Sequence, residues 1–294
     1  MRDEVATILI SAHPDDVALS VGGSILAGYF KRPLLIVSVF SWGGTAPLYS
    51  GSHDLETLYK LMVREDEAFA GAVGCGLVDL DMTDVALDST LGEHFKPLRW
   101  LSCLLRGPPP PNDMELERGL TRLSAKVPRS MKWSLMKSMV GLEGAYHSLK
   151  ERLWELVSKH PDASLASPLS LGLHPDHVLV TCACKNLIPP DRIIYYEDLP
   201  YSMTYNLTGI ARHVRSFDRN LRPTLIDIEG VMTPKLRNLG FYESQLAPID
   251  IARVAKHARR LGSGGRAYER IWTSGRSSGI RKEVQRTMSY SLKR

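Results

Sequence analysis

One short polar turn, set between two apolar runs, constrains the fold of this 294-residue chain more than any other feature. The turn reads His13-Pro14-Asp15-Asp16; it follows the run Val5 to Ile10 and precedes the run Val17 to Phe30. The first run is typical of a buried parallel strand, and the second has the apolar spacing of a helix face. In open α/β sheets, ligands bind outside the carboxyl ends of strands. An imidazole and two adjacent carboxylates at such a junction therefore indicate a metal site.

The rest of the chain alternates between expected strands and helices. Strands are expected over 34–40, 77–82, 163–166, 192–196 and 224–228. Helices are expected over 54–73, 146–159, 178–187, 234–242 and 248–261. This alternation predicts an α/β fold with a Rossmann-like, doubly wound and mainly parallel sheet.

A proline-rich stretch and a basic segment interrupt this pattern. The stretch Gly107 to Pro111 suits neither a helix interior nor a central strand, so a helical, proline-rich insertion is predicted over about 91–140. The segment 251–294 contains 12 Lys+Arg and 2 Asp+Glu, a net charge of +10, so the remainder of this +5 chain carries −5. We expect a solvated basic segment rather than a nucleic-acid site. We also expect that residues 1–294 form a single domain.

Composition indicates an ordinary globular protein, with 44% hydrophobic and 23% charged residues. The sequence contains no apolar run near the roughly 20 residues that cross a bilayer, and its acidic start leads directly into a strand. The four cysteines lack the spacing of paired metal ligands, which favours a reducing compartment. We therefore expect a cytoplasmic protein without a membrane span or nucleic-acid partner, and leave a homo-oligomer open.

A second polar group, His174-Pro175-Asp176-His177, stands at another expected strand-to-helix junction. Proline is common in the first turn of a helix, so Pro175 places His174 at the cap and His177 in the first turn. Residues three apart share a helix face, and both imidazoles can therefore point into one crevice. Such a pair is also common at solvated helix starts, but its position after a second strand supports a site shared with the first turn.

The combined residues suit metal-assisted hydrolysis. His13, Asp16 and His177 would supply two nitrogens and one oxygen, and a catalytic zinc has three protein ligands and an open position for water. Bound water of this kind has a pKa of about 7 and can attack a polarised carbonyl. Asp15 is then the candidate general base. His174 is the candidate for stabilising the oxyanion or protonating the leaving nitrogen.

The two motifs, Ala12 to Asp16 and His174 to His177, resemble those of the PIG-L/LmbE-like deacetylases, named after N-acetylglucosaminyl-phosphatidylinositol de-N-acetylase. The resemblance covers roughly residues 5–90 and 145–201. It implies a Rossmann-like fold, one zinc ion per chain (Fe²⁺ or another divalent ion being possible) and hydrolysis of an N-acyl group, an N-acetyl group above all, from a small-molecule amino sugar or its conjugate. The family's roles map onto the same residues: His13, Asp16 and His177 as ligands, Asp15 as base, and His174 as the second histidine.

The resemblance also suggests two substrate-binding residues and reveals two departures. Arg64 and Asp84 match positions that could hold sugar hydroxyls, although a surface ion pair or a turn explains either residue equally well. Val17 replaces a Glu found in many members. That Glu is not a metal ligand in the family pattern, so the change affects the residues that orient the ligands more than the activity itself. Gly172 replaces a Tyr that some members use as an oxyanion donor, so another donor or the metal alone must serve.

Two other functions stay open at this stage. One is an amidase acting on a non-sugar amide or a thiol conjugate, which the motifs do not distinguish from an amino-sugar deacetylase. The other is a non-catalytic Rossmann-like binding module for nucleotides. The sequence favours the module less, because no GxGxxG follows the first strand and two acids there would repel a phosphate.

Overall fold

A seven-stranded sheet forms the centre of the computed structural model, which describes residues 4–43, 48, 54–85, 142–172, 174–262 and 264–274. The strands are β1 Thr7–Ser11, β2 Leu34–Trp42, β3 Gly76–Thr83, β4 Ser164–Pro168, β5 Ile193–Tyr196, β6 Leu221–Asp227 and β7 Tyr268–Ser274. The helices are α1 Asp16–Leu26, α2 Leu55–Val73, α6 Leu142–Val157, α7 Pro175–Lys185, α8 Leu207–Phe217, α9 Met232–Leu239 and α10 Pro248–Leu261. The expected insertion over 91–140 and the end of the basic segment, 275–294, lie outside the described residues.

The strand order is β3-β2-β1-β4-β5-β7-β6, and β1 to β5 are all parallel. The chain builds outward from β1 to β2 and β3, then returns to add β4 on the other side of β1. The two middle strands are in register, with Leu9 opposite Ala166. This reversal between β1 and β4 is the topological switch point at which α/β sheets form a ligand crevice. The model confirms the mainly parallel α/β sheet predicted from the sequence.

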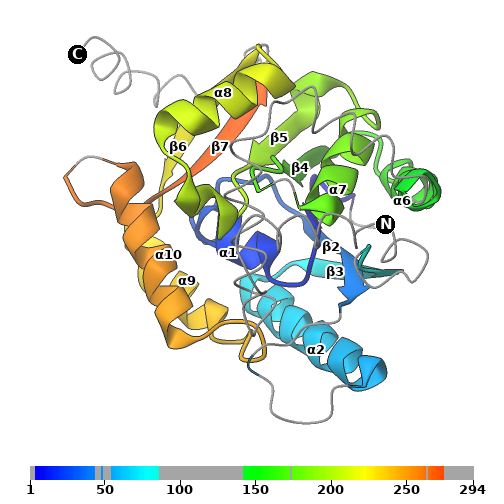
Figure 1. The fold of residues 1–294 in the computed structure, drawn as a ribbon, viewed down its shortest axis with the longest axis horizontal. Coiled ribbons are helices and arrows are strands. Elements are labelled where there is room, and N and C mark those ends of the chain that lie inside the picture. Colours follow the sequence, from blue (N-terminus) through cyan, green and yellow to red (C-terminus); the bar gives the residue numbers. More distant parts are fainter. Residues whose placement is uncertain are drawn as a thin grey trace, which may run out of the picture.

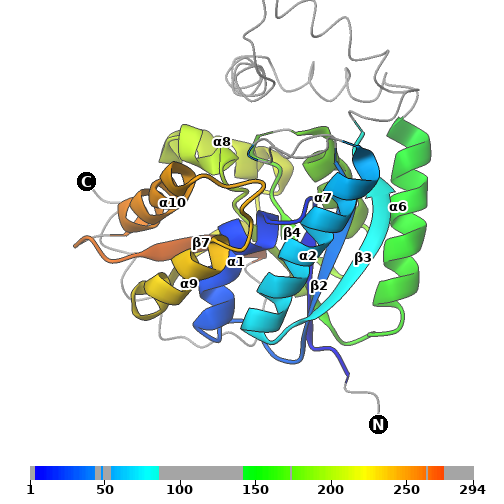
Figure 2. The same cartoon turned by 90° about the horizontal axis from the view of Figure 1, so that it is seen from below.

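Helices cover both faces of the sheet, as Figure 1 and Figure 2 show for α2 on one side and α6 on the other. Strand residues alternate between the two faces, so Leu9 packs in the cluster with α1, α2, α9 and α10, whereas Ile8 and Ile10 pack with α6 and α7. Helix α8 packs beside α7, on the same face of the sheet as α6 and α7, against residues of β5 and β7. The result is a three-layer sandwich with apolar packing on both sides of β1.

Local chemistry explains where the helices near the sheet edge begin and end. Asp54 caps α2 by accepting the backbone N–H of Thr57, and Gly74 ends the helix with a φ of 63°. Pro175 occupies the first turn of α7, as predicted. The described part of the chain contains no candidate membrane-spanning helix.

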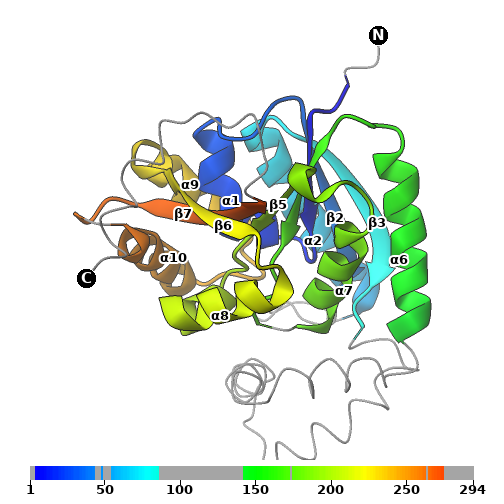
Figure 3. The same cartoon turned by 90° about the horizontal axis from the view of Figure 1, so that it is seen from above.

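The sheet ends in two antiparallel strands that the sequence analysis did not fully anticipate. β7 pairs antiparallel with both β5 and β6, and Figure 3 shows β6 and β7 side by side. β6 begins three residues before the expected strand, and β7 was not expected at all. The reason is that β7 carries Glu269 and Arg270 in succession, and both are buried through ion pairs, with Lys235 and Glu197 respectively. Within the basic segment, β7 thus belongs to the sheet, whereas α10 carries exposed side chains such as Arg253.

A buried ion pair joins these late elements to α1. Glu269 of β7 accepts the backbone N–H groups of Gly23 and Ser24, at 2.9 and 2.6 Å, and pairs with Lys235 of α9. The Lys235 ammonium in turn donates to the Leu19 carbonyl at 2.7 Å. The carbonyl of Leu19 and the N–H of Gly23 are one helical turn apart, at the spacing of hydrogen-bond partners in a helix. The ion pair therefore lies beside the middle of α1. A Cβ at Gly23 would lie 2.8 Å from Glu269 Oε1, which explains why glycine occupies this position.

Candidate metal centre

The two predicted motifs meet where β1 and β4 end side by side. The first motif forms the turn between β1 and α1, and the second begins α7 after β4. Because β1 and β4 are parallel neighbours, both motifs project from the same edge of the sheet. Residues more than 150 positions apart in the chain are therefore brought together, with His13 Nε2 3.0 Å from Asp176 Oδ2.

The predicted ligand residues converge on one carboxylate oxygen. Asp16 Oδ2 lies 3.3 Å from His177 Nε2 and 3.5 Å from His13 Nδ1. It also accepts the His13 backbone N–H at 2.7 Å, which fixes the carboxylate in the turn. The side chains of Asp16 and His177 are 5% and 1% exposed, whereas that of His13 is 24% exposed and leaves the group accessible from one side. One atom from each of these three residues lies within 4.8 Å of the others, a spacing that suits a metal ion.

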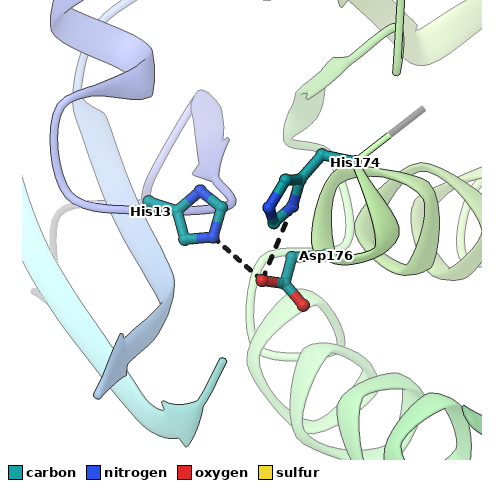
Figure 4. Close-up of side chains that lie close together, drawn as sticks. All are labelled: His13, His174 and Asp176. Carbon is teal, nitrogen blue, oxygen red and sulfur yellow. Dashed lines mark hydrogen bonds and ion pairs between the residues drawn. The ribbon is translucent and has the colours of Figure 1, made fainter. Parts of the chain in front are cut away.

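A second group overlaps the first through His13. Figure 4 shows His13 and His174 directed toward Asp176, whose Oδ2 lies 3.0 Å from His13 Nε2 and 3.6 Å from His174 Nδ1. These three residues are also close enough to hold an ion. Asp176, however, is already engaged by hydrogen bonds, because its other oxygen accepts the Val85 backbone N–H at 3.1 Å.

The donor set of the first group fits a metal ion. His177 Nε2 is buried and has no hydrogen-bond partner among the described residues, although it faces Asp16. A buried nitrogen of this kind costs free energy unless something binds it. Two imidazole nitrogens and a carboxylate oxygen are suitable ligands for zinc and for other divalent transition metals.

Each ligand-set histidine is held by a further carboxylate on its other ring nitrogen. Asp176 contacts His13 Nε2, and Asp198 contacts His177 Nδ1 at 2.8 Å. Both carboxylates are fully buried. Neither residue was predicted from the sequence to have a role in the site. Asp176 lies inside the second motif, and Asp198 follows β5, the strand next to β4. These two positions, each after the end of a strand near the site, could have marked both residues as candidates.

Neighbouring carboxylates raise the pKa values of His13 and His177. Burial disfavours the charged ring of His13, but hydrogen bonds to Asp16 and Asp176 outweigh it and raise the pKa of His13 well above its ordinary value. Burial also opposes the charged form of His177, and the charges of Asp16 and Asp198 nevertheless raise its pKa. Burial works against the charge of Asp16 as well, yet the nearby His177 lowers its pKa. The negative potential that stabilises these protons also suits a divalent cation.

Asp15, the candidate base, caps α1 in an unusual conformation. Its φ is 107°, which is costly for a residue with a side chain and is common at functional sites. The residue is half-buried, and burial together with the charge of Asp16 raises the pKa of Asp15 well above its ordinary value. Such a carboxylate accepts a proton more readily than an exposed one.

The two candidate substrate-binding residues occupy different surroundings. Arg64 is exposed on α2, whereas its neighbours Glu65 and Asp66 are buried and bond to Ser244 and Tyr242. Asp84 follows β3, and its side chain lies close to that of Asp176, beside the histidine group.

Tyr201 fills the space beside Gly172. A Cβ atom at Gly172 would lie 2.3 Å from Tyr201 Cδ1 and 2.4 Å from its Cγ. The Tyr201 ring centre is 5.3 Å from that of His177 and 6.2 Å from that of His174. A tyrosine thus packs against both histidines of the second motif, although it is supplied from a later position in the chain.

The chain is similar to several deacetylases. It is 26% identical over 272 residues to the 2'-N-acetylparomamine deacetylase of Streptomyces fradiae, covering 92% of this chain and 81% of that protein. The crystal structure of a pseudoaglycone deacetylase of an antimicrobial reagent matches with a TM-score of 0.57 and 19% identity, over 92% of this chain and 97% of that chain. The zinc-inhibited form of a teicoplanin deacetylase matches with a TM-score of 0.58 and 16% identity, over 91% and 97%. At these identities the solved structures share the fold. No protein-family model matches the chain.

Proposed function

We propose that this chain is a PIG-L/LmbE-like deacetylase and that it hydrolyses an N-acetyl group from a small-molecule amino sugar or amino-sugar conjugate. The observation that carries the proposal is the convergence of His13, Asp16 and His177 on one point, with Asp15 adjacent in the chain. The similarity to a 2'-N-acetylparomamine deacetylase supports the substrate class.

We propose that His13, Asp16 and His177 hold one divalent ion. This set is favoured over the overlapping set with His174 and Asp176, because hydrogen bonds already occupy both oxygens of Asp176. Two imidazoles and one carboxylate are typical of a catalytic zinc site. Fe²⁺ is the alternative ion, and the inhibition by zinc named for one teicoplanin deacetylase makes the comparison of ions part of the test.

A bound divalent ion supplies Lewis acidity, which acidifies water and polarises an acyl carbonyl. Asp15 accepts the proton of the attacking water, and its raised pKa favours that transfer. His174 stands at the start of α7 beside the ligand set, with its ring centre 5.1 Å from that of His13. From there it stabilises the negative charge that develops on the acyl oxygen, or donates a proton to the leaving nitrogen.

Arg64 and Asp84 remain candidates for contacts to sugar hydroxyls. Asp84 is the stronger of the two, since it adjoins Asp176 at the histidine group. Arg64 is exposed on α2 and would act at the outer part of a larger substrate.

The direct test is hydrolysis by the full chain after removal of its metal and addition of zinc, iron(II) or no ion. The substrates are 2'-N-acetylparomamine, free N-acetylglucosamine and a non-sugar acetamide, and the readout is released acetate. We expect ion-dependent hydrolysis of an acetylated amino sugar. Hydrolysis of the non-sugar amide alone would support the amidase instead, and no hydrolysis with any ion would contradict the proposal.

A further inference from the structure

We propose that Asp198 is a positioning residue that fixes the tautomer of His177. The Asp198 carboxylate stands between two donors from different parts of the loop and helix that follow β4. Its Oδ1 lies 2.8 Å from His177 Nδ1, and its Oδ2 accepts the Leu171 backbone N–H at 2.9 Å. This inference rests on the proposed function, because it concerns how a proposed metal ligand presents its nitrogen.

The backbone N–H of Leu171 occupies one oxygen of Asp198 and leaves the other oxygen to His177. A backbone N–H can only donate, and an ionised carboxylate can only accept. The contact between Asp198 Oδ1 and His177 therefore requires a proton on Nδ1 of the ring. In the neutral ring Nε2 then carries a lone pair, and this is the atom that faces Asp16 at 3.3 Å.

Asp198 holds the Nδ1 proton of His177 in surroundings that are buried from solvent. Asp198 and Leu171 are fully buried and His177 is 1% exposed. The Asp198 carbonyl also accepts the Ser202 backbone N–H at 2.8 Å, which fixes Asp198 at both its backbone and its side chain. A rigid carboxylate behind an imidazole sets both its ring orientation and its tautomer.

Asp198→Asn tests this assignment because the Leu171 N–H can only donate, whereas the His177 ring can either donate or accept at Nδ1. Leu171 N–H still needs an acceptor, so the Asn oxygen must face Leu171. The Asn NH₂ group then faces His177 and turns Nδ1 into an acceptor, which moves the ring proton to Nε2. The same substitution therefore keeps the volume of the side chain and places a proton where the ion would bind.

Two measurements read this change without relying on turnover. The first is the affinity for zinc by chelator competition, which we expect to fall about 10–100-fold in Asp198→Asn. The second is the ¹⁵N spectrum of His177 in metal-free protein, at a pH high enough to deprotonate the ring. Wild-type protein should have the proton on Nδ1, and the variant should have it on Nε2.

Asp227→Asn is the matched control, since Asp227 lies on β6 and pairs with Arg266 at the surface. It should bind zinc as the wild type does. Equal zinc affinity in Asp198→Asn and wild type, or a wild-type His177 protonated on Nε2, would overturn the inference. If Asp198→Asn does not fold, the wild-type tautomer alone decides. Failure of the wild type to bind any ion would instead contradict the proposed function.

Discussion

Asp16 and His177 stand 161 positions apart in the chain, yet Asp16 Oδ2 lies 3.3 Å from His177 Nε2. The contact exists because β1 and β4 are adjacent, and each residue sits in the first turn of the helix after its strand. The fold thus builds the candidate site from two short local motifs at the topological switch point. The proposed chemistry depends on this contact.

Removing His177 tests the ligand set. We expect His177→Ala to lose its divalent ion, because two remaining ligands seldom hold a catalytic metal. The loss in affinity should exceed the roughly 10–100-fold expected for a residue that only orients a ligand. Elemental analysis after dialysis measures it, with His147→Ala on the exposed face of α6 as the control. Full metal content in His177→Ala would exclude His177 as a ligand.

Removing the Asp15 carboxylate should separate catalysis from metal binding. Asp15→Ala should keep its ion and lose about 10²–10⁴-fold in kcat, the usual contribution of a general base. Asp15→Gly should lose the same activity and be the more stable variant, because glycine adopts a φ of 107° without steric cost. Steady-state kinetics and thermal unfolding provide the two readouts. Parent-level turnover in either variant would show that another group takes the proton.

A methyl group at Gly172 should disturb the packing of Tyr201. Gly172→Ala places a Cβ atom 2.3 Å from the Tyr201 ring, so the ring or the backbone must shift and the packing of the ring on His177 must change. We expect a loss of about 1–3 kcal/mol in the free energy of unfolding, as for other overpacked sites. The loss should be smaller when Tyr201 is already alanine, which a double-mutant cycle measures. Additive effects in that cycle would mean that the two residues do not share this space.

The two halves of the buried ion pair should contribute unequally to stability. Glu269→Leu leaves the Lys235 ammonium and the N–H groups of Gly23 and Ser24 without their carboxylate, so it should cost about 3–5 kcal/mol. Lys235→Met leaves those N–H groups bonded and should cost less. Chemical unfolding of both variants tests the order. The control is Asp227→Asn at the surface, where a change of less than about 1 kcal/mol is expected.

His257 should make stability depend on pH below neutrality. Burial, with nearby Arg260, Arg270 and Lys235, lowers the pKa of His257 to about 4 from its ordinary value of 6.5. Between about pH 4 and pH 6.5, the unfolded chain binds a proton at this residue and the folded chain does not. The contribution of His257 to the free energy of unfolding is therefore complete above pH 6.5 and is lost as the pH falls toward 4. The loss is on the order of 3 kcal/mol. His257→Gln should weaken this pH dependence, and His147→Gln should not; an unchanged slope in His257→Gln would contradict the assignment.

Local sequence carried most of the information about the candidate site. The turn at His13 and the helix start at His177 each follow a short apolar strand, and adjacency of parallel strands then brings them together. Asp198 could not be assigned in the same way, since its partners His177 and Leu171 precede it by 21 and 27 positions. Their contact depends on how β5 pairs with β4.

The antiparallel end of the sheet was harder to predict for a different reason. Strand β7 was missed because Glu269 and Arg270 interrupt its apolar pattern, and only their buried partners, Lys235 and Glu197, make that sequence compatible with a sheet interior. Charges paired over long sequence distances cannot be identified from a local pattern.

Anomalous scattering at the zinc edge from crystals of the zinc-loaded protein locates the bound ion directly. We expect one peak, within bonding distance of His13 Nδ1, Asp16 Oδ2 and His177 Nε2. A peak between His13, His174 and Asp176, or no peak at this end of the sheet, would contradict the proposed site.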